Sequence, residues 1–305
     1  MAKSAVVAIV GRTNAGKSTL VNRLVGEKVS IVSPVEQTTR NTIRGIVEDP
    51  RGQLVLLDTP GLHKAVGEFG KILNRMARRT AAGADILAVV FDASLKAQME
   101  DVGWMCRVAN ENPEKVVFIL NKCDKGPVQE DSFREAWQEA KAQSQTPPQT
   151  EPVWVRCSAT SNEGAAAALD ALFSLAGEGE ALFPGDIVTD YPRRLAIADT
   201  IREKFLGFLH QELPHELGIA VKDIEEVGGR AWNVKVDVLV NRASQKPIVI
   251  GRGADTIKRV RKLSERELSE IFGVRVSLIL WVRVEPGWMK NRQLLAAMGY
   301  AGGDI

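Results

Sequence analysis

The first half of the chain alternates short apolar runs with longer segments of helical periodicity. Several of the short runs are apolar at nearly every position, which is typical of strands buried on both faces. These runs lie at residues 5–10, 53–58, 85–93, 115–122 and 152–159. The periodic segments predict helices at residues 17–26, 69–82, 98–110, 130–143 and 164–175. This alternation predicts an α/β domain with a mostly parallel sheet, whose ligands bind where the strands end.

The pattern changes after a stretch of low periodicity at residues 177–186, which contains three glycines and a proline. We therefore expect domains at residues 1–176 and 191–305, joined by a linker at 177–190. The predicted elements beyond the linker are a helix at about 192–211, strands at 217–227 and 231–240, a helix at about 255–271 and a strand at 274–284. This order predicts an α+β unit with one antiparallel strand pair.

Composition and charge limit the classes of partner. The 305 residues are 45% hydrophobic and 26% charged, and the formal net charge is +2. These values are typical of a soluble globular protein and exclude a strong overall attraction to nucleic acid, so any basic surface must be local. Cys106, Cys123 and Cys157 lack the spacing of metal ligands, and we expect reduced, buried thiols in a cytoplasmic protein. No apolar run approaches the length that spans a membrane.

The sequence GRTNAGKS directly follows the first apolar run and precedes a predicted helix. This context predicts a phosphate-binding loop, because glycines admit the phosphates close to backbone N–H groups at a helix N-terminus. Lys17 is expected to reach the outer phosphates, and Ser18 to supply a hydroxyl to Mg²⁺. The predicted nucleotide-binding residues of this loop are Gly11, Asn14, Ala15, Gly16, Lys17, Ser18 and Thr19.

The motif DTPG, from Asp58 to Gly61, ends the next apolar run. Its carboxylate can hold Mg²⁺ through water, and the Gly61 N–H can contact a γ-phosphate. An ordinary turn is the alternative for this motif alone, but its position after a phosphate loop favours a functional site.

The motif NKCD, from Asn121 to Asp124, indicates which base is bound. The Asp124 carboxylate can accept both N1–H and the N2 amino group of guanine, whereas adenine would leave a buried carboxylate unpaired. Asn121 can bond the purine edge, and the stem of Lys122 can cover the ring. After the last apolar run, Ser158 and Ala159 can offer a backbone N–H to guanine O6.

Together with the C-terminal half, these motifs make the chain similar to the Era family, in which a translation-factor-class GTPase domain precedes a KH domain. GRTNAGKS, QTTR, DTPGLH, NKCD and CSA occur in the expected order within residues 5–175. The resemblance implies GTP hydrolysis with Mg²⁺ and a switch at Gln37–Asn41. We favour Thr39 over Thr38 or Thr42 as the Mg²⁺ contact.

The residues expected to take part in hydrolysis are Lys17, Asn14, Thr39 and Gly61. Leu62 stands where many small GTPases carry a water-orienting glutamine, so intrinsic hydrolysis should be slow or should use another element. Related GTPases hold K⁺ beside the phosphates, and the Asn14 amide oxygen is the candidate ligand here. Asn14 could instead stabilise the turn of the loop. His63 is expected to be a surface residue rather than a base.

Basic residues concentrate at residues 242–262, where seven Lys or Arg stand against Asp255 alone. A solvated helix face is one interpretation. The resemblance favours a KH domain of the type II-like form, whose Gly-x-x-Gly loop clamps single-stranded RNA. Ala254 replaces the last glycine of that loop, so either the loop geometry has shifted or the grip on RNA is weaker. The predicted RNA-binding residues are Ile250, Gly251, Arg252, Gly253, Ala254, Lys258, Arg259 and Lys262.

The ending at residues 281–300 also resembles the family. Trp288 and Tyr300 could stack on bases, although packing in the core is favoured.

The expected function is a GTP-hydrolysing switch that binds the 3′ end of 16S ribosomal RNA and acts in assembly of the 30S subunit as a cytoplasmic monomer. NKCD argues against an ATPase or nucleotide kinase. Two alternatives stay open: an RNA-binding protein with only regulatory nucleotide binding, and a GTPase acting on a membrane or cell-cycle partner. Because family members have been linked to membranes, peripheral association at the inner face of the cell membrane also stays open.

Overall fold

The computed structural model describes residues 2–33, 35, 38–61, 67–145, 148–209, 211 and 213–300. Gln37, Leu62 and His63 of the expected switch segments lie outside these described residues. Contacts divide the chain into two units, Met1–Val32 with Thr39–Asp190 and Ser33–Thr38 with Tyr191–Ile305. Within the described ranges, no helix is long and apolar enough to cross a membrane.

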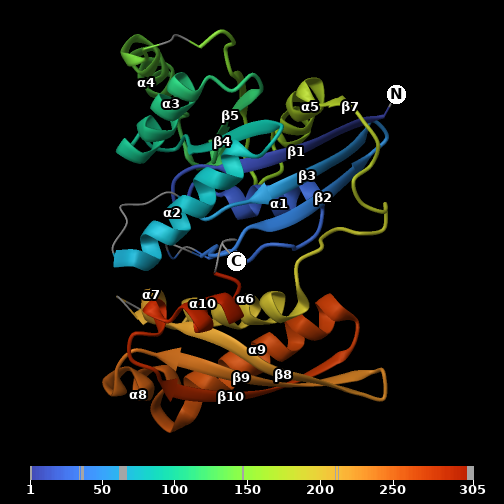
Figure 1. Cartoon of the computed structure of the whole chain (residues 1–305), viewed down its shortest axis with the longest axis vertical. Helices are drawn as coiled ribbons and strands as arrows, with labels where there is room; N and C mark the ends of the chain where they lie inside the picture. The colour runs from blue at the N-terminus through green and yellow to red at the C-terminus, as the bar shows by residue number, and fades with distance from the viewer. Residues whose placement is uncertain are drawn as a thin grey trace. The chain divides into compact units, whose positions relative to one another are not determined.

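The first unit is built on one sheet with the strand order β2-β3-β1-β4-β5-β6, and β7 pairs with β1 (Figure 1). The strands are β1 (Lys3–Val10), β2 (Ile43–Asp49), β3 (Gly52–Asp58), β4 (Ile86–Asp92), β5 (Val116–Asn121), β6 (Val153–Arg156) and β7 (Gly177–Glu178). Only β2 and β7 run antiparallel to the strands they pair with among those described. The predicted α/β class with a mostly parallel sheet is therefore confirmed.

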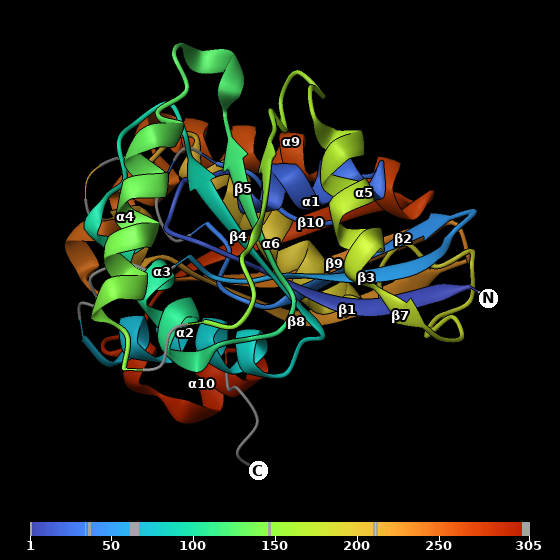
Figure 2. The ribbon, with the colours of Figure 1, turned by 90° about the horizontal axis from the view of Figure 1, so that it is seen from above.

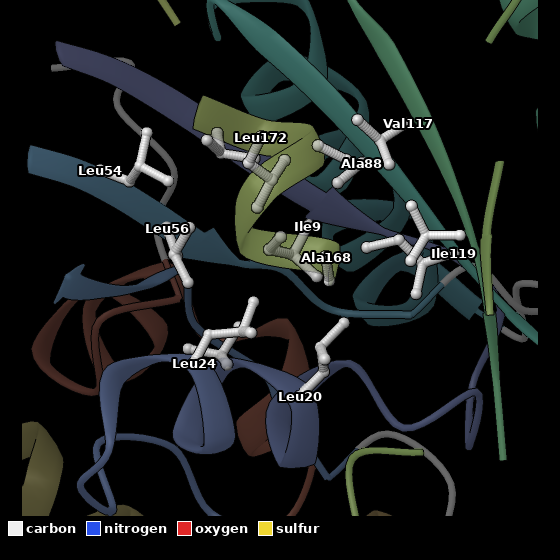
Figure 3. Close-up of a cluster of buried hydrophobic side chains, with 14 of the residues drawn as sticks. Ile9, Leu20, Leu24, Leu54, Leu56, Ala88, Val117, Ile119, Ala168 and Leu172 are labelled. Carbon is white, nitrogen blue, oxygen red and sulfur yellow. The ribbon is translucent and has the colours of Figure 1, made fainter. Parts of the chain in front are cut away.

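Helices cover both faces of this sheet, with α1 and α5 on one face and α3 and α4 on the other (Figures 1 and 2). The helices are α1 (Lys17–Val25), α2 (Gly67–Ala82), α3 (Met99–Glu111), α4 (Glu130–Gln143) and α5 (Ala165–Leu175). Leu20 of α1 and Leu172 of α5 pack against Ile9 and Leu56 of the strands (Figure 3). Burial of each such side chain contributes about 1.5–3 kcal/mol, so this layer anchors the loops at the strand ends.

The second unit is a three-stranded sheet with the order β10-β9-β8, in which β8 and β9 are antiparallel and β9 and β10 parallel. Its elements are α6 (Arg193–Leu206), α7 (Leu213–Glu216), β8 (Gly218–Val227), β9 (Ala231–Val240), α8 (Lys246–Ile250), α9 (Asp255–Phe272), β10 (Arg275–Val284) and α10 (Arg292–Ala297). Val234 and Val236 on the inward face of β9 pack with Phe205 of α6 and with Val260 and Leu268 of α9. The predicted α+β unit with a KH-like element order is confirmed.

Three expectations need correction. Residues 43–49 form β2, which is not among the predicted strands, because pairing with β3 outweighs the weak strand pattern of IRGIVED. The helix expected to reach residue 211 ends at Leu206, where Gly207 follows. Cys157 is buried, but Cys106 and Cys123 are only half-buried.

The favoured interpretation of the C-terminal aromatic residues is confirmed. Trp288 and Tyr300 are both buried, and Nε1 of Trp288 donates to the carbonyl oxygen of Glu216 at 2.9 Å. Neither ring is exposed for stacking on a base.

Candidate functional site

The four nucleotide motifs lie at the carboxyl ends of parallel strands, as the sheet topology requires. GRTNAGKS follows β1, DTPG follows β3, NKCD follows β5 and Ser158-Ala159 follows β6. The loop after β1 ends at Gly16, which has a φ of 94° and is the N-cap residue of α1. A Cβ there would stand 2.3 Å from Nδ2 of Asn121, so glycine allows the phosphate loop and the guanine motif to approach closely.

Lys17 is folded back over its own loop. Its Nζ donates to the carbonyl oxygens of Gly11 at 3.2 Å and Arg12 at 2.8 Å. Burial lowers the pKa of Lys17 to about 8, although Asp58 partly opposes this shift. A phosphate anion would replace the two carbonyl partners and stabilise the ammonium, so the geometry suits a lysine that binds an anionic ligand.

The residues expected at Mg²⁺ gather at one point. The hydroxyl oxygens of Ser18 and Thr39 lie 2.8 Å apart. Both oxygens of the Asp58 carboxylate are buried and accept no hydrogen bond that meets normal geometry from the described residues. Burial raises the pKa of Asp58, and the Ser18 hydroxyl and Lys17 ammonium oppose the shift only in part.

The neighbouring threonines Thr38 and Thr42 have other partners. The Thr38 hydroxyl donates to the carbonyl of Val35 at 2.5 Å, and the Thr42 hydroxyl lies 3.4 Å from that of Thr80. Thr39 is thus the threonine of the segment placed beside Ser18, while its role as a metal contact stays a prediction.

Gly61 lies against the phosphate loop. A Cβ at this position would come within 2.8 Å of Cα of Thr13 and 2.9 Å of Nζ of Lys17. The preceding Thr59 fixes the turn, since its hydroxyl donates to the Ile9 carbonyl at 2.8 Å. Any side chain at residue 61 would occupy the space beside the lysine that the phosphates need.

The guanine motif is braced against two neighbouring loops. Nδ2 of Asn121 donates to the Ala15 carbonyl at 2.9 Å, and Oδ1 of Asn121 accepts from Ala159 N at 3.0 Å. Asn121 therefore positions the loops, a role that sequence reasoning did not assign to it. The Ser158 amide donates to the Glu163 carbonyl at 2.7 Å, so either predicted amide must exchange its present partner to reach guanine O6.

Asp124 is exposed in the short 3₁₀ turn Cys123–Lys125. The base itself would have to bury this carboxylate, so the penalty against adenine arises only once a base is in place.

Asn14 is also exposed and has a φ of 59°, a left-handed conformation that asparagine tolerates better than most residues. The backbone conformation of Asn14 suits either a K⁺ ligand or a turn. Thr19, another predicted nucleotide-binding residue, lies half-buried in the first turn of α1.

Three charged residues beside these motifs were missed by sequence reasoning. Asp92, at the end of β4, pairs with Nζ of Lys122 at 2.6 Å. Arg12 of the phosphate loop pairs with Asp92 at 3.4 Å and with Asp101 at 3.2 Å. Arg12 stands inside a recognised motif, but the sequence holds no signal that selects these two acids among 38.

The loop expected to bind RNA connects α8 to α9. Gly251, Gly253 and Ala254 all have positive φ, at 78°, 63° and 62°. Ala254 therefore has a left-handed backbone conformation, which is strained for a residue that carries a Cβ. The shifted loop geometry and the weaker grip on RNA both stay predictions.

The basic side chains of the loop and helix are largely exposed. Nζ of Lys258 donates to the Gly253 carbonyl at 3.2 Å, and Arg259 pairs with Asp255 at 2.9 Å. Arg252 and Lys262 form no ion pair within the described part of the chain. Ile250 is half-buried against the core, next to the loop.

Comparison with known proteins agrees with both units. A family model described as 50S ribosome-binding GTPase matches residues 6–122, and a KH domain model matches residues 212–289. GTPase Era of Synechocystis sp. is 36% identical over 298 residues, which cover 98% of this chain and 92% of the relative. The chain belongs to the Era family of GTPases. GTPase Era of Lacticaseibacillus paracasei is 34% identical over 305 residues, covering 99% and 98% of the two chains.

Two solved Era structures match nearly the full length. Era in complex with MgGDPNP and nucleotides 1506–1542 of 16S ribosomal RNA is 31% identical, with a TM-score of 0.88 over 99% of this chain and 100% of that chain. An Aquifex aeolicus Era variant bound to GDP and aluminium fluoride is also 31% identical, with a TM-score of 0.87 over 98% and 99% of the chains. As an Era-family protein, the chain is a GTPase that hydrolyses GTP.

Proposed function

We propose that this Era-family GTPase binds the 3′ end of 16S ribosomal RNA through its KH unit and acts in assembly of the 30S subunit. The observation that carries the proposal is the full-length likeness to Era bound to MgGDPNP and a 16S ribosomal RNA segment. The glycine-containing turn before α9 and the exposed cations Arg252 and Lys262 supply what a phosphodiester backbone requires.

The first unit fits a nucleotide with Mg²⁺. The two buried oxygens of Asp58, with no hydrogen bond from the described residues, are a donor set for a hard cation, as are the adjacent hydroxyls of Ser18 and Thr39. When bound there, Mg²⁺ supplies positive charge to the β- and γ-phosphate oxygens. Lys17 would hold the same oxygens after leaving its two carbonyl partners, and the Gly61 N–H would contact the γ-phosphate. K⁺ at Asn14 remains a prediction.

The linker offers a route by which nucleotide state could alter RNA binding. Residues 182–190 run beside β2 and β3, where Ile46 N donates to the Val188 carbonyl at 2.9 Å. The buried side chain of Gln53 accepts from Leu182 N at 2.7 Å and Phe183 N at 2.9 Å. Since β2 directly follows the expected switch, ordering of the switch by γ-phosphate would act on the segment that leads to the KH unit.

The test measures binding of a labelled RNA with the 16S 3′-end sequence to the full chain saturated with GDP or GDPNP. We expect the two affinities to differ, and we expect Arg252→Ala to weaken both. Arg51→Ala, an exposed substitution in the first unit, serves as the matched control for charge. Equal RNA affinity in the two nucleotide states would remove the coupling, and equal affinity for an unrelated RNA would remove the proposed specificity.

The monomeric state and the membrane association stay predictions. Sedimentation of the GDP-bound chain and flotation with anionic vesicles test them directly. GTP hydrolysis rates measured in K⁺ and in Na⁺ at equal ionic strength test the predicted role of K⁺. Equal rates in the two cations would contradict that role.

A further inference from the structure

Four charged side chains from separate segments form one compact network in the first unit. They are Arg12 of the phosphate loop, Asp92 at the end of β4, Asp101 in the first turn of α3 and Lys122 of the guanine motif. The side chains of Asp101 and Asp92 are 0% and 7% exposed, so water screens these pairs weakly. Two cations balance two anions, and loss of either acid leaves an uncompensated positive charge.

Asp92 is the centre of the network. One carboxylate oxygen, Oδ2, accepts from Nζ of Lys122 at 2.6 Å and faces Nη2 of Arg12 at 3.4 Å. The other, Oδ1, accepts from the Ser94 hydroxyl at 2.5 Å and the Ser94 amide at 3.2 Å. Burial alone would raise the pKa of Asp92, but the hydrogen bonds from Lys122 and Ser94 hold the pKa below its ordinary value. Asp92 is therefore an oriented anion near neutral pH.

The network reaches both ends of the nucleotide site. Oδ2 of Asp101 accepts from Arg12 Nε at 3.2 Å and from the Gln98 amide at 3.0 Å, which ties the phosphate loop to the start of α3. At the other end, the Lys122 side chain extends toward the phosphate loop. Its Cε lies 3.9 Å from the position that a Cβ on Gly16 would occupy. The lysine stem thus spans from the guanine motif to the loop, and its ammonium ends on Asp92.

We propose that Asp92 is a positioning residue for nucleotide binding, which holds the Lys122 stem where it covers the purine ring. The inference rests on the proposed placement of a guanine nucleotide at these motifs. In this proposal Asp92 affects the binding of the base rather than of the phosphates, and it acts through Lys122. Asp101, which touches Arg12 alone among the four, belongs to the phosphate end of the network.

The experiment compares Asp92→Asn, Lys122→Met and the double variant, with Asp101→Asn as the matched loss of a network carboxylate. Displacement of fluorescent GDP is measured with GDP, IDP and inorganic tripolyphosphate as competitors. Loss of a charge-assisted hydrogen bond predicts GDP affinity about tenfold to a hundredfold weaker in Asp92→Asn. Tripolyphosphate should compete almost unchanged, because it has no base for Lys122 to cover. The ratio of GDP to IDP affinity should also persist, since Asp124 reads the N2 edge.

The double variant tests the role of Lys122 itself, and two further variants test its neighbours. The double variant should bind GDP no more weakly than Lys122→Met, because the two substitutions remove the same contact. Asp101→Asn should weaken tripolyphosphate and GDP alike. Ser94→Ala keeps every charge but removes one hydrogen bond to Asp92, so it should reproduce the Asp92→Asn pattern at smaller amplitude. It replaces Asp92→Asn as the test if Asp92→Asn does not fold.

Equal losses for GDP and tripolyphosphate in Asp92→Asn would overturn the proposal, as would additive losses in the double variant. Unchanged GDP affinity in both Asp92→Asn and Ser94→Ala would overturn it too. A wild-type chain that binds tripolyphosphate but no guanine nucleotide would instead overturn the proposed nucleotide placement. These outcomes distinguish a failure of the role proposed for Asp92 from a failure of the proposed nucleotide placement.

Discussion

Substitution of Ala254 by glycine tests the loop that precedes α9. Ala254 has a φ of 62°, a left-handed conformation that costs a residue with a Cβ about 1–2 kcal/mol. Glycine removes that cost but adds about 0.5–1 kcal/mol of backbone entropy lost on folding. The difference predicts that Ala254→Gly stabilises the second unit by about 0.5–1 kcal/mol.

Two neighbouring glycines provide a graded series. At Gly253, with a φ of 63°, a Cβ would meet open space, so Gly253→Ala should cost the strain of about 1–2 kcal/mol less the about 0.5–1 kcal/mol of backbone entropy that alanine saves. At Gly251 a Cβ would stand 2.3 Å from the Thr256 hydroxyl oxygen, so Gly251→Ala should destabilise the unit more than Gly253→Ala does. The expected order of stability is Ala254→Gly, wild type, Gly253→Ala and Gly251→Ala.

The assay is urea unfolding of the full chain, followed by hydrogen exchange of peptides from β9, which lies in the core of the second unit. The GDP-bound first unit provides an internal reference, because its peptides should not change along the series. The same variants are titrated with 16S 3′-end RNA, and we expect Ala254→Gly to bind more tightly because the methyl group at the backbone approach is gone. If the Ala254→Gly variant is less stable than wild type, the left-handed conformation of Ala254 and the strain assigned to it are refuted.

Three further predictions concern the first unit. Lys17 has a pKa of about 8, so its ammonium is present below that pH and lost above it, and GDP affinity measured by fluorescence should fall by up to about tenfold per unit above about pH 8. Asp58→Asn removes the buried anion, and we expect the gain in GDPNP affinity on adding Mg²⁺ to shrink by about tenfold, as isothermal titration would show. Gln53→Ala leaves two linker amides without their acceptor at a cost of about 1–3 kcal/mol, which should raise hydrogen exchange at residues 182–183. A flat pH profile, an unchanged Mg²⁺ effect or unchanged exchange would contradict the respective prediction.

The long helices and the buried strands of both units were predictable because their periodicity is strong and their boundaries carry glycine or polar residues, whereas the short α7, α8 and α10 were not predicted. β2 was not, since its pattern is weak and its stability comes from pairing with β3 and from the linker at Val188. The motif loops could be placed at the carboxyl ends of strands because parallel strands bring those ends to one edge. The bonds within the motifs could not be foreseen: Asn121 joins Ala15 to Ala159 only because β6 and the phosphate loop both lie beside its strand end.

The ionic network shows what strand order adds to a motif. Sequence patterns locate β1, β4 and β5, but they do not say that β4 lies between the other two. Once that order is known, the register places Val10 opposite Val89 and Asp92 opposite Asn121. Arg12 and Lys122, each just past the end of its strand, must then emerge on either side of Asp92. A carboxylate at residue 92 can therefore compensate both cations at once, whereas the same carboxylate one residue earlier would point to the opposite face of the sheet.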